Sequence, residues 1–307
     1  MHADIGGKTL VDAGDPEPKA PRGLRLELDR VSFTYQAGTP FASPALQEIS
    51  LTVEPGERLG IAGPVGSGKS TLLDAMAGID APASGRVLHD GREITSKNPA
   101  LPGSIGLAFQ SPENCLFEKT VFDDVAFSPR RQRLPAGEVR RRAEEALSAA
   151  GLDPGRFGPR SPFSLSAGEQ RRAALAGVMA VAPRALLLDE PTAYLDPATR
   201  RELIGRLVEL NRRTGVTMVI VGHDMQELAA FAERLVILDR GVKVAEGPAR
   251  SILSDAELLD AHNLDPPGTV EFCRLLAKAT GLGIPPTVNE EETAGLLLDL
   301  MANKRRP

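Results

Sequence analysis

Residues 63–70, Gly63-Pro64-Val65-Gly66-Ser67-Gly68-Lys69-Ser70, match the pattern GxxxxGK[ST]. Glycines let successive backbone N–H groups curl around phosphate oxygens, and the start of a following helix adds partial positive charge. The residues before this stretch, 58–62, predict a strand, and Lys69 to Ala77 predict an apolar helix. Strand, glycine loop and helix in this order indicate a phosphate-binding loop in an α/β protein.

The chemistry predicted for this loop is nucleotide binding. Lys69 is expected to reach the β- and γ-phosphates, and Ser70 to offer its hydroxyl to Mg²⁺. The candidate nucleotide-binding residues of the loop and of its continuation are Gly63, Pro64, Val65, Gly66, Ser67, Gly68, Lys69, Ser70 and Thr71.

A second apolar run, Leu186-Leu187-Leu188, ends in Asp189 and Glu190. In phosphate-loop enzymes an Asp at a strand end helps to hold Mg²⁺, and Glu190 is suited to polarise an attacking water as a general base. Taken alone, the pair would be read as a solvated acidic strand end, but together with the phosphate loop it predicts a metal and catalytic role. A guanine-specific enzyme is not favoured, because Asn303-Lys304 is followed by Arg305 instead of completing an Asn-Lys-x-Asp element.

The pattern along the chain predicts an α/β core with additions. Near-continuous apolar runs separated by helical patterns favour a parallel sheet buried on both faces, and alternation in two N-terminal segments predicts antiparallel strands. The predicted strands are 24–35, 49–53, 105–109, 185–188, 217–221 and 235–238, with a helix over 197–211. Further helices are expected at Glu138–Ala150 and Ala167–Ala182, and at Asp255–Ala261, Val270–Ala279 and Glu290–Asn303.

These patterns divide the chain into three parts. We predict a flexible tail over residues 1–24, a nucleotide-binding domain over 25–247 and a small helical domain over 248–307. Within the middle part, residues from about 115 to 180 form an inserted helical subdomain.

Composition excludes several classes of protein. The 307 residues are 42 % hydrophobic and 25 % charged, which is ordinary globular usage and not that of a disordered chain, a collagen or a coiled-coil rod. A net charge of −5 and the lack of Trp argue against nucleic acid as a partner. Cys115 and Cys273 make no disulfide framework, so we expect a reducing compartment. No apolar run approaches the length of a membrane span, so we expect no membrane-spanning helix. The start at Met1-His2-Ala3-Asp4 lacks the features of a signal peptide.

The segment Ser164-Leu165-Ser166-Ala167-Gly168-Glu169-Gln170-Arg171-Arg172 opens the predicted helix at 167. By itself it would be an ordinary serine cap. It resembles the signature motif of ATP-binding cassette (ABC) ATPases, usually Leu-Ser-Gly-Gly-Gln. The resemblance implies that Ser166, Ala167, Gly168 and Glu169 complete the ATP site of the opposite protomer. Ala167 and Glu169 depart from the usual motif, and an acidic residue there is unfavourable near a phosphate.

Other segments resemble the rest of the family's motifs, in order, over residues from about 25 to 245. Gln110 resembles the Q-loop glutamine that senses Mg²⁺ and the transmembrane partner, and Ala193-Tyr194-Leu195-Asp196 resembles the D-loop. Val221-Gly222-His223-Asp224 resembles the switch-histidine loop, and Tyr35 occupies the place of the adenine-stacking aromatic. Tyr194 is bulkier than the usual small residue. The resemblance implies catalytic roles for Glu190, His223 and Gln110, an Mg²⁺ site at Ser70, Gln110 and Asp189, and a D-loop role for Asp196.

Four segments narrow the resemblance to the ATPases of energy-coupling factor (ECF) importers. The first is 109–117, which has Cys115 where glutamine is usual, and the second is the Gly-Thr-Pro-Phe insert in 35–41. The other two are the helix over 168–177 and the start of the C-terminal domain at 254–259. The 35–41 insert resembles the second of the two paired ATPases. Pro112 to Phe117 is then expected to form a groove lip that grips a coupling helix of a membrane subunit. Without the family it would be a polar turn closed by two core residues.

This resemblance implies an ATP-hydrolysing subunit that powers an importer of vitamins or transition-metal ions. It implies two ATP–Mg²⁺ held between this chain and a second ABC ATPase, with a different partner favoured over a second copy. A transmembrane coupling subunit and a substrate-binding membrane subunit complete the expected complex, which places the chain peripherally on the cytoplasmic face of a prokaryotic cell membrane. An ATPase of another ABC importer class, or an ABC ATPase that does not act in transport, remains the alternative.

Overall fold

The computed structural model describes residues 23–303, with side chains up to residue 300. The predicted tail therefore lies outside the described residues, apart from Gly23 and Leu24. Leu24 is buried, and its N–H donates to the carbonyl of Arg184 over 3.1 Å. The packed part of the chain thus includes Leu24, before the predicted boundary at residue 25.

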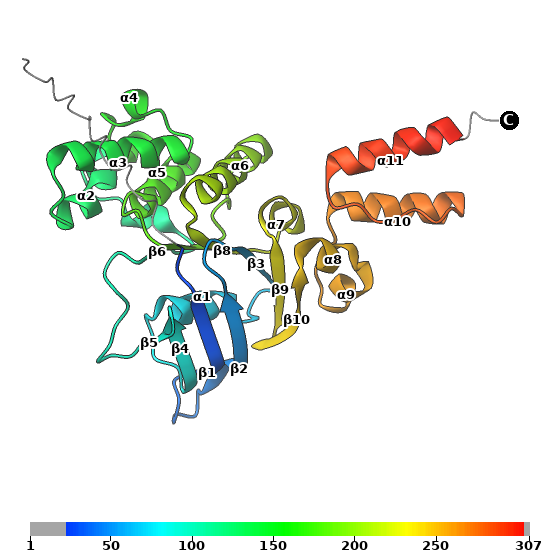
Figure 1. Cartoon of the computed structure of the whole chain (residues 1–307), viewed down its shortest axis with the longest axis horizontal. Coiled ribbons are helices and arrows are strands. Elements are labelled where there is room, and N and C mark those ends of the chain that lie inside the picture. Colours follow the sequence, from blue (N-terminus) through cyan, green and yellow to red (C-terminus); the bar gives the residue numbers. More distant parts are fainter. Residues whose placement is uncertain (1–22, 304–307) are drawn as a thin grey trace, which may run out of the picture.

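A six-stranded sheet forms the centre of the molecule, in the order β10-β9-β3-β8-β7-β6 (Figure 1). Its strands are β3 (Arg58–Ala62), β6 (Ile105–Ala108), β7 (Ala185–Asp189), β8 (Thr217–Val221), β9 (Arg234–Asp239) and β10 (Val242–Pro248). Five strands run parallel, and β10 pairs antiparallel with β9 at one edge. Alternate residues of β7 enter different clusters, with Leu186 and Leu188 on one side and Leu187 on the other. The predicted parallel sheet, buried on both faces, is confirmed.

A smaller antiparallel sheet packs beside it, in the order β2-β1-β4-β5. Its strands are β1 (Leu26–Tyr35), β2 (Ser43–Val53), β4 (Ser84–His89) and β5 (Arg92–Glu93). The β2 strand begins earlier than the predicted strand at residue 49, because Phe33 to Tyr35 of β1 continue the pairing as far as Ser43. Between the two sheets lies α1 (Lys69–Ala77), whose Leu72, Leu73 and Met76 are almost completely buried.

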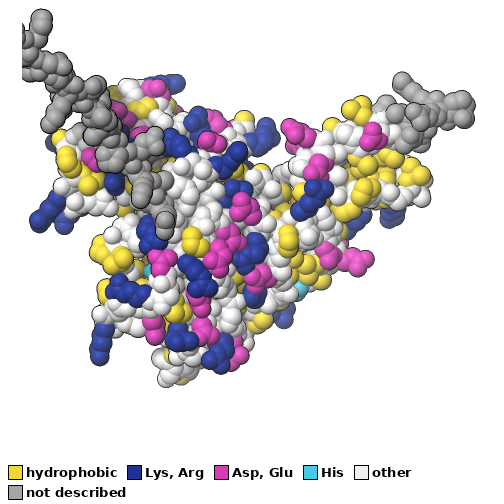
Figure 2. All heavy atoms as spheres, in the orientation of Figure 1, with side chains coloured by type: hydrophobic (Ala, Val, Ile, Leu, Met, Phe, Trp, Pro, Cys, Tyr) yellow, Lys and Arg dark blue, Asp and Glu magenta, His cyan; other side chains and the backbone are white. Residues whose placement is uncertain are grey.

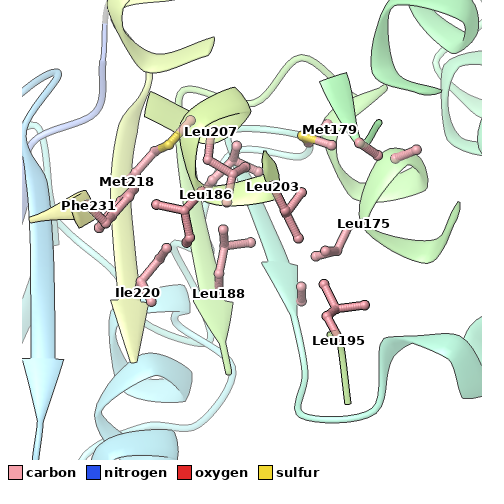
Figure 3. Packing of buried hydrophobic residues seen from close by; sticks show 14 of the residues in the cluster. Leu175, Met179, Leu186, Leu188, Leu195, Leu203, Leu207, Met218, Ile220 and Phe231 are labelled. Carbon is pink, nitrogen blue, oxygen red and sulfur yellow. The ribbon is translucent and has the colours of Figure 1, made fainter. Parts of the chain in front are cut away.

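The other face of the central sheet is covered by α6 (Pro197–Thr214), α7 (Met225–Phe231) and part of a helical group. Figure 3 shows this core, in which Leu203 and Leu207 of α6 lie against Leu186 of β7 and Met218 of β8. The helical group contains η1 (Pro112–Cys115), α2 (Val121–Arg131), α3 (Ala136–Ala149), α4 (Pro154–Phe157), η2 (Pro162–Ser164) and α5 (Ala167–Met179). It occupies the range of the predicted helical subdomain, and α5 ends at Met179 instead of the predicted Ala182, which has a φ of 54°.

The C-terminal elements are α8 (Ala249–Ser254), α9 (Ala256–Ala261), α10 (Gly268–Thr280) and α11 (Glu290–Asn303). Helix α8 packs on β10 and α7, whereas α10 and α11 form a pair at the end of the molecule farthest from α2 and α3 (Figure 1). Figure 2 shows hydrophobic side chains gathered over this pair, and acidic and basic side chains interspersed over the central part of the same face.

Candidate functional site

The phosphate loop joins β3 to α1, and two of its glycines are required by close packing. A Cβ on Gly63, at φ 155°, would lie 2.2 Å from the carbonyl oxygen of Leu238. A Cβ on Gly68, at φ 100°, would lie 2.4 Å from the carbonyl oxygen of Ala45. Gly66 has open space around it but also a positive φ of 80°, which L side chains rarely adopt. Gly63 and Gly68 are therefore required by close packing as well as by their backbone conformation, whereas Gly66 is required by its backbone conformation alone.

Lys69 begins α1, and its ammonium group folds back over the loop. Its Nζ donates to the carbonyl oxygens of Gly63 and Pro64, over 2.8 and 2.9 Å. Burial lowers the pKa of Lys69 below its usual value, while the nearby Glu190 and Asp189 carboxylates act in the opposite direction. The structure thus places the cation inside the curl of the loop, where it can reach an anion held there.

Ser70 and Asp189 meet at the carboxyl edge of the central sheet. The Oγ of Ser70 donates to Oδ2 of Asp189 over 2.6 Å, although the two residues come from α1 and from the end of β7. Burial raises the pKa of Asp189, and the hydrogen bond from Ser70 opposes that shift. A hydroxyl and a carboxylate are hard oxygen donors of the kind that Mg²⁺ uses when it keeps several waters and bridges to phosphates. The donor set therefore fits Mg²⁺, and no larger cluster of His, Cys, Asp and Glu suited to a metal occurs among the described residues.

Glu190 follows Asp189 in a left-handed backbone conformation, at φ 47°. Its N–H donates to the carbonyl of Val221 over 2.9 Å, which holds it beside the end of β8. Its Oε1 lies 2.9 Å from Nδ1 of His223, whose side chain is 70 % exposed. The predicted switch histidine and the predicted general base are thus in direct contact.

Tyr35 lies at the end of β1, near the start of α1. Its hydroxyl is 2.9 Å from Oγ1 of Thr71, and its ring packs edge-on against Phe33 with centroids 5.0 Å apart. The side chain of Tyr35 is 46 % exposed, so one part of it is open to a ligand. Gln110 lies two residues beyond the end of β6 and is also exposed.

The signature segment caps α5 through a reciprocal pair of hydrogen bonds. The N–H of Glu169 donates to Oγ of Ser166 over 3.3 Å, and the N–H of Ser166 donates to Oε2 of Glu169 over 2.8 Å. Ala167 is the first helical residue, and a Cβ on Gly168 would lie 3.0 Å from Leu195. The backbone hydrogen bond from Ser166 is the main cause that lowers the pKa of Glu169. Glu169 therefore acts as the acidic partner in a capping box, which explains how an acidic residue is accommodated at this position.

The signature segment is not brought onto the phosphate loop of its own chain. No hydrogen bond joins residues 166–169 to residues 63–71 in the part of the chain that the structure describes. The D-loop residue Asp196 caps α6 by accepting from the N–H groups of Ala198 and Thr199, over 3.0 and 3.1 Å. Both segments open helices, and neither lies in the cluster of Lys69, Ser70, Asp189 and Glu190.

Two buried polar residues beside the site were not predicted. Arg171 on α5 is 1 % exposed and donates to the carbonyl oxygens of Glu190 and Pro191, over 2.6 and 3.2 Å. Glu227 on α7 is buried and accepts a hydrogen bond from Oγ1 of Thr192. Arg171 belongs to the signature segment, but the residues beside it are hydrophilic, so the sequence does not indicate that its side chain is buried. Glu227 lies on the core-facing side of α7 with Leu228 and Phe231. Because its side chain is acidic, the sequence pattern of α7 predicts exposure at this position.

Comparison with known proteins identifies relatives of this chain. Residues 46–193 match the family model described as ABC transporter. The energy-coupling factor transporter ATP-binding protein EcfA2 of Symbiobacterium thermophilum is 44 % identical over 286 residues, which cover 92 % of this chain and 98 % of that protein. The protein of the same name from Latilactobacillus sakei is 42 % identical over 275 residues, which cover 88 % of this chain and 94 % of that protein.

Solved structures give the same result for the fold. The cbiO1 protein of Clostridium perfringens, part of the ABC transporter complex cbiONQ, superposes with a TM-score of 0.68 at 34 % identity, over 78 % of this chain and 94 % of that one. A dimer of the ATP-binding cassette MJ0796, bound to ADP and Pi, superposes with a TM-score of 0.66 at 32 % identity, over 73 % and 99 % of the two chains. The predicted ABC ATPase fold is confirmed. The chain belongs to the ABC ATPases and, among these, to the ATP-binding proteins of energy-coupling factor transporters.

Proposed function

We propose that this chain binds ATP with Mg²⁺ at the carboxyl edge of the central sheet and hydrolyses it to drive transport. The observation that carries the proposal is the 2.6 Å contact between Ser70 and Asp189, formed next to the cation of Lys69. Since those three residues come from α1 and β7, only the folded sheet assembles them. Gly66, with open space around it and a φ of 80°, leaves the backbone at the middle of the loop accessible to phosphate oxygens.

Each residue has a role in this proposal. The loop N–H groups and Lys69 hold the phosphates, while Tyr35 stacks on the adenine. Ser70, Asp189 and Gln110 hold Mg²⁺, which neutralises charge on the phosphates when it is bound. Glu190 accepts a proton from the attacking water, and the contact of 2.9 Å with His223 holds its carboxylate in place.

Two ATPases are proposed to form the working unit. Within one chain Ser166 caps α5 and Gly168 lies in its first turn, without a hydrogen bond to the phosphate loop among the described residues, so we propose that they are available to a nucleotide bound by a partner. The dimer of the MJ0796 cassette, bound to ADP and Pi, supports this arrangement by likeness. The names of the relatives favour a partner that is a different ATPase, with two copies of this chain as the alternative.

Membrane subunits complete the proposed complex. A cavity of about 320 Å³ lies between η1 and α5, lined among others by Pro112, Phe117 and Gly177. Its lining fits the proposal that a short helix of a transmembrane coupling subunit docks there, with a further membrane subunit that binds the imported vitamin or metal ion. None of the helices in residues 23–303 is long and apolar enough to span a bilayer. The proposed docking onto a transmembrane subunit implies a peripheral location on the cytoplasmic face of the membrane, as for an ATP-binding protein of an energy-coupling factor transporter.

The test is ATP hydrolysis by the chain purified together with its natural partners. We expect Ser70→Ala to raise the Mg²⁺ concentration needed for half-maximal hydrolysis, because one oxygen ligand is removed. Ser148→Ala is the matched control, since that hydroxyl donates to the carbonyl of Glu144 on the exposed side of α3. Hydrolysis that is independent of Mg²⁺, or equal Mg²⁺ requirements for the two variants, would contradict the assignment.

A further inference from the structure

Arg171 connects several elements that the proposed mechanism treats separately. Its Nη2 donates to the carbonyl oxygen of Glu190 over 2.6 Å, and its Nε donates to that of Pro191 over 3.2 Å. Its Nη1 lies 3.3 Å from Oε2 of Glu113 on η1. The guanidinium group also lies over the ring of Tyr194, 5.9 Å from its centroid. A single side chain therefore contacts the strand end, the D-loop and the groove segment.

Because this guanidinium group is buried, the side chain of Arg171 cannot move without losing hydrogen bonds. Arg171 is 1 % exposed, so water does not replace a partner that moves away. The guanidinium fork is planar, and its donors point in fixed directions. If η1 shifts together with Glu113, the whole fork must turn, and the carbonyl oxygens of Glu190 and Pro191 must follow or lose their hydrogen bonds.

Arg171 connects two segments that have proposed functions, the η1 segment with Glu113 and the main chain of Glu190. Glu113 belongs to η1, and Pro112 and Cys115 of the same element line the cavity proposed for the membrane subunit. At the other end, Glu190 has a positive φ of 47°, a backbone conformation that is uncommon for residues with a Cβ. The hydrogen bond from Arg171 to the Glu190 carbonyl is one of the interactions that hold this backbone.

We propose that Arg171 is a positioning residue that links the position of η1 to the backbone of Glu190, and so makes the general base responsive to what binds in the groove. The proposal rests on the function proposed above for Glu190. Arg171 itself does not touch substrate. It acts on the orientation of the Glu190 carboxylate through the main chain.

The first experiment is Arg171→Lys in the complete complex, with ATP hydrolysis measured as kcat and KM separately. Lysine keeps the charge but presents a single ammonium group, which cannot reach the acceptors on both sides at once. We expect kcat to fall about ten- to a hundredfold, the equivalent of one hydrogen bond to a charged group, while nucleotide affinity changes less than about twofold. Arg142→Lys is the matched control, because Arg142 on α3 also binds a carboxylate, Glu138, and a main-chain carbonyl, that of Val181, far from Glu190. That control should leave kcat unchanged.

A second readout separates positioning from a merely structural role. In a Glu190→Gln background, we expect Arg171→Lys to cause little further loss of kcat, because the carboxylate that it orients is already absent. A structural defect would lower the remaining activity by the same factor in both backgrounds. An equal factor in both backgrounds, or equal kcat for Arg171→Lys and Arg142→Lys, would overturn the proposal.

Glu113→Gln tests the same contact if Arg171→Lys does not fold. The side chain of Glu113 is 23 % exposed, so its substitution should disturb folding less than that of the buried Arg171. We expect this variant to lower kcat and to weaken the stimulation of hydrolysis by the membrane subunits. Unaltered stimulation would refute the link to the groove. If the wild-type complex does not hydrolyse ATP at all, the proposed function fails instead, so the two failures are distinguishable.

Discussion

Replacing Glu227 with Gln should stabilise this protein at pH 8 far more than at pH 5. Glu227 lies on the inner side of α7, where its carboxylate accepts from Thr192. Burial raises its pKa from the ordinary 4.5 to about 7, and the negative charge of Asp224 acts in the same direction. The hydrogen bond from Thr192 and the positive charges of Arg200 and His223 oppose this shift without cancelling it.

The sign and size of the effect follow from linkage. Below pH 4.5 the carboxyl group is protonated in both the folded and the unfolded chain, and burial has no electrostatic cost. As the pH rises from 4.5 to 7, the unfolded chain loses this proton while the folded chain keeps it, so stability falls. The loss is about 1 kcal/mol at pH 5 and about 3 kcal/mol at pH 8. Gln resembles the protonated carboxyl in shape and charge at every pH, so the variant should avoid this loss.

The assay is urea unfolding of wild type and variant at pH 5 and at pH 8. Because both proteins share every other titrating group, the difference between them isolates Glu227. Glu202→Gln serves as the control for removal of a charge, since Glu202 is on the exposed side of α6 and pairs with Arg206. If Glu227→Gln shows the same stability difference from wild type at both pH values, the burial argument is refuted.

Three other substitutions test the site. Glu190→Gln in the complete complex should lower kcat by about 10² to 10⁴ while ATP binding survives, because only the proposed base is removed. Rapid phosphate release at the wild-type rate would contradict that role. Lys69→Ala should weaken ATP binding by this chain, measured by titration with labelled nucleotide, and unchanged affinity would argue against the phosphate loop. Glu169→Ala should lower stability by about 1 kcal/mol in thermal unfolding, because the capping box over Ser166 is lost. Its effect should shrink as the pH falls through the lowered pKa of Glu169, and a constant effect would refute the charge-based part of the argument.

The elements around the phosphate loop could be predicted from sequence with accurate bounds. Helix α1 runs from Lys69 to Ala77 as expected, because a glycine loop opens it and Gly78, at φ 71°, closes it. Strand β8 also has the expected bounds, since it is a continuous apolar run in a parallel sheet. Helix α6 extends beyond the predicted Asn211 to Thr214, and its end is marked by Gly215 at φ 69°. Local signals gave accurate bounds for α1 and β8, whereas the predicted end of α6 stopped short of the boundary that Gly215 marks.

Other elements carry signals that tertiary packing overrides. Helix α2 lies within the predicted helical subdomain but was not predicted as a helix, and it contains Pro129, a residue type that normally argues against one. Pro129 lies in the last turn, and it is buried together with Val121, Val125 and Ala126. Strand β10 was also not predicted. Its apolar residues Val242 and Val244 are exposed while Lys243 between them is half-buried, so the residue types mark no buried face, and the strand is defined by its pairing with β9. Helix α2 is stabilised by packing on α3 and α5, and β10 by its pairing with β9, which ends at Asp239. In both cases contacts with other elements, and not the residue types within the element, stabilise the structure.

In the catalytic region the roles of single residues could be predicted from the sequence, whereas the contacts that hold these residues in place could not. Asp189 and Glu190 were predicted from an apolar run that ends in two carboxylates, and the structure places the first against Ser70 and the second against His223. The residues that hold this arrangement, Arg171 and Glu227, are charged side chains on helix faces, where periodicity predicts exposure. Their burial has a physical consequence. A buried polar group must keep its hydrogen-bond partners, so in the proposed role of Arg171 a displacement of η1 or α5 is passed to the strand end that carries Glu190. The parallel sheet supplies a fixed edge for the phosphates, and the buried guanidinium group of Arg171 is proposed to make the neighbouring Glu190 carboxylate sensitive to the position of η1.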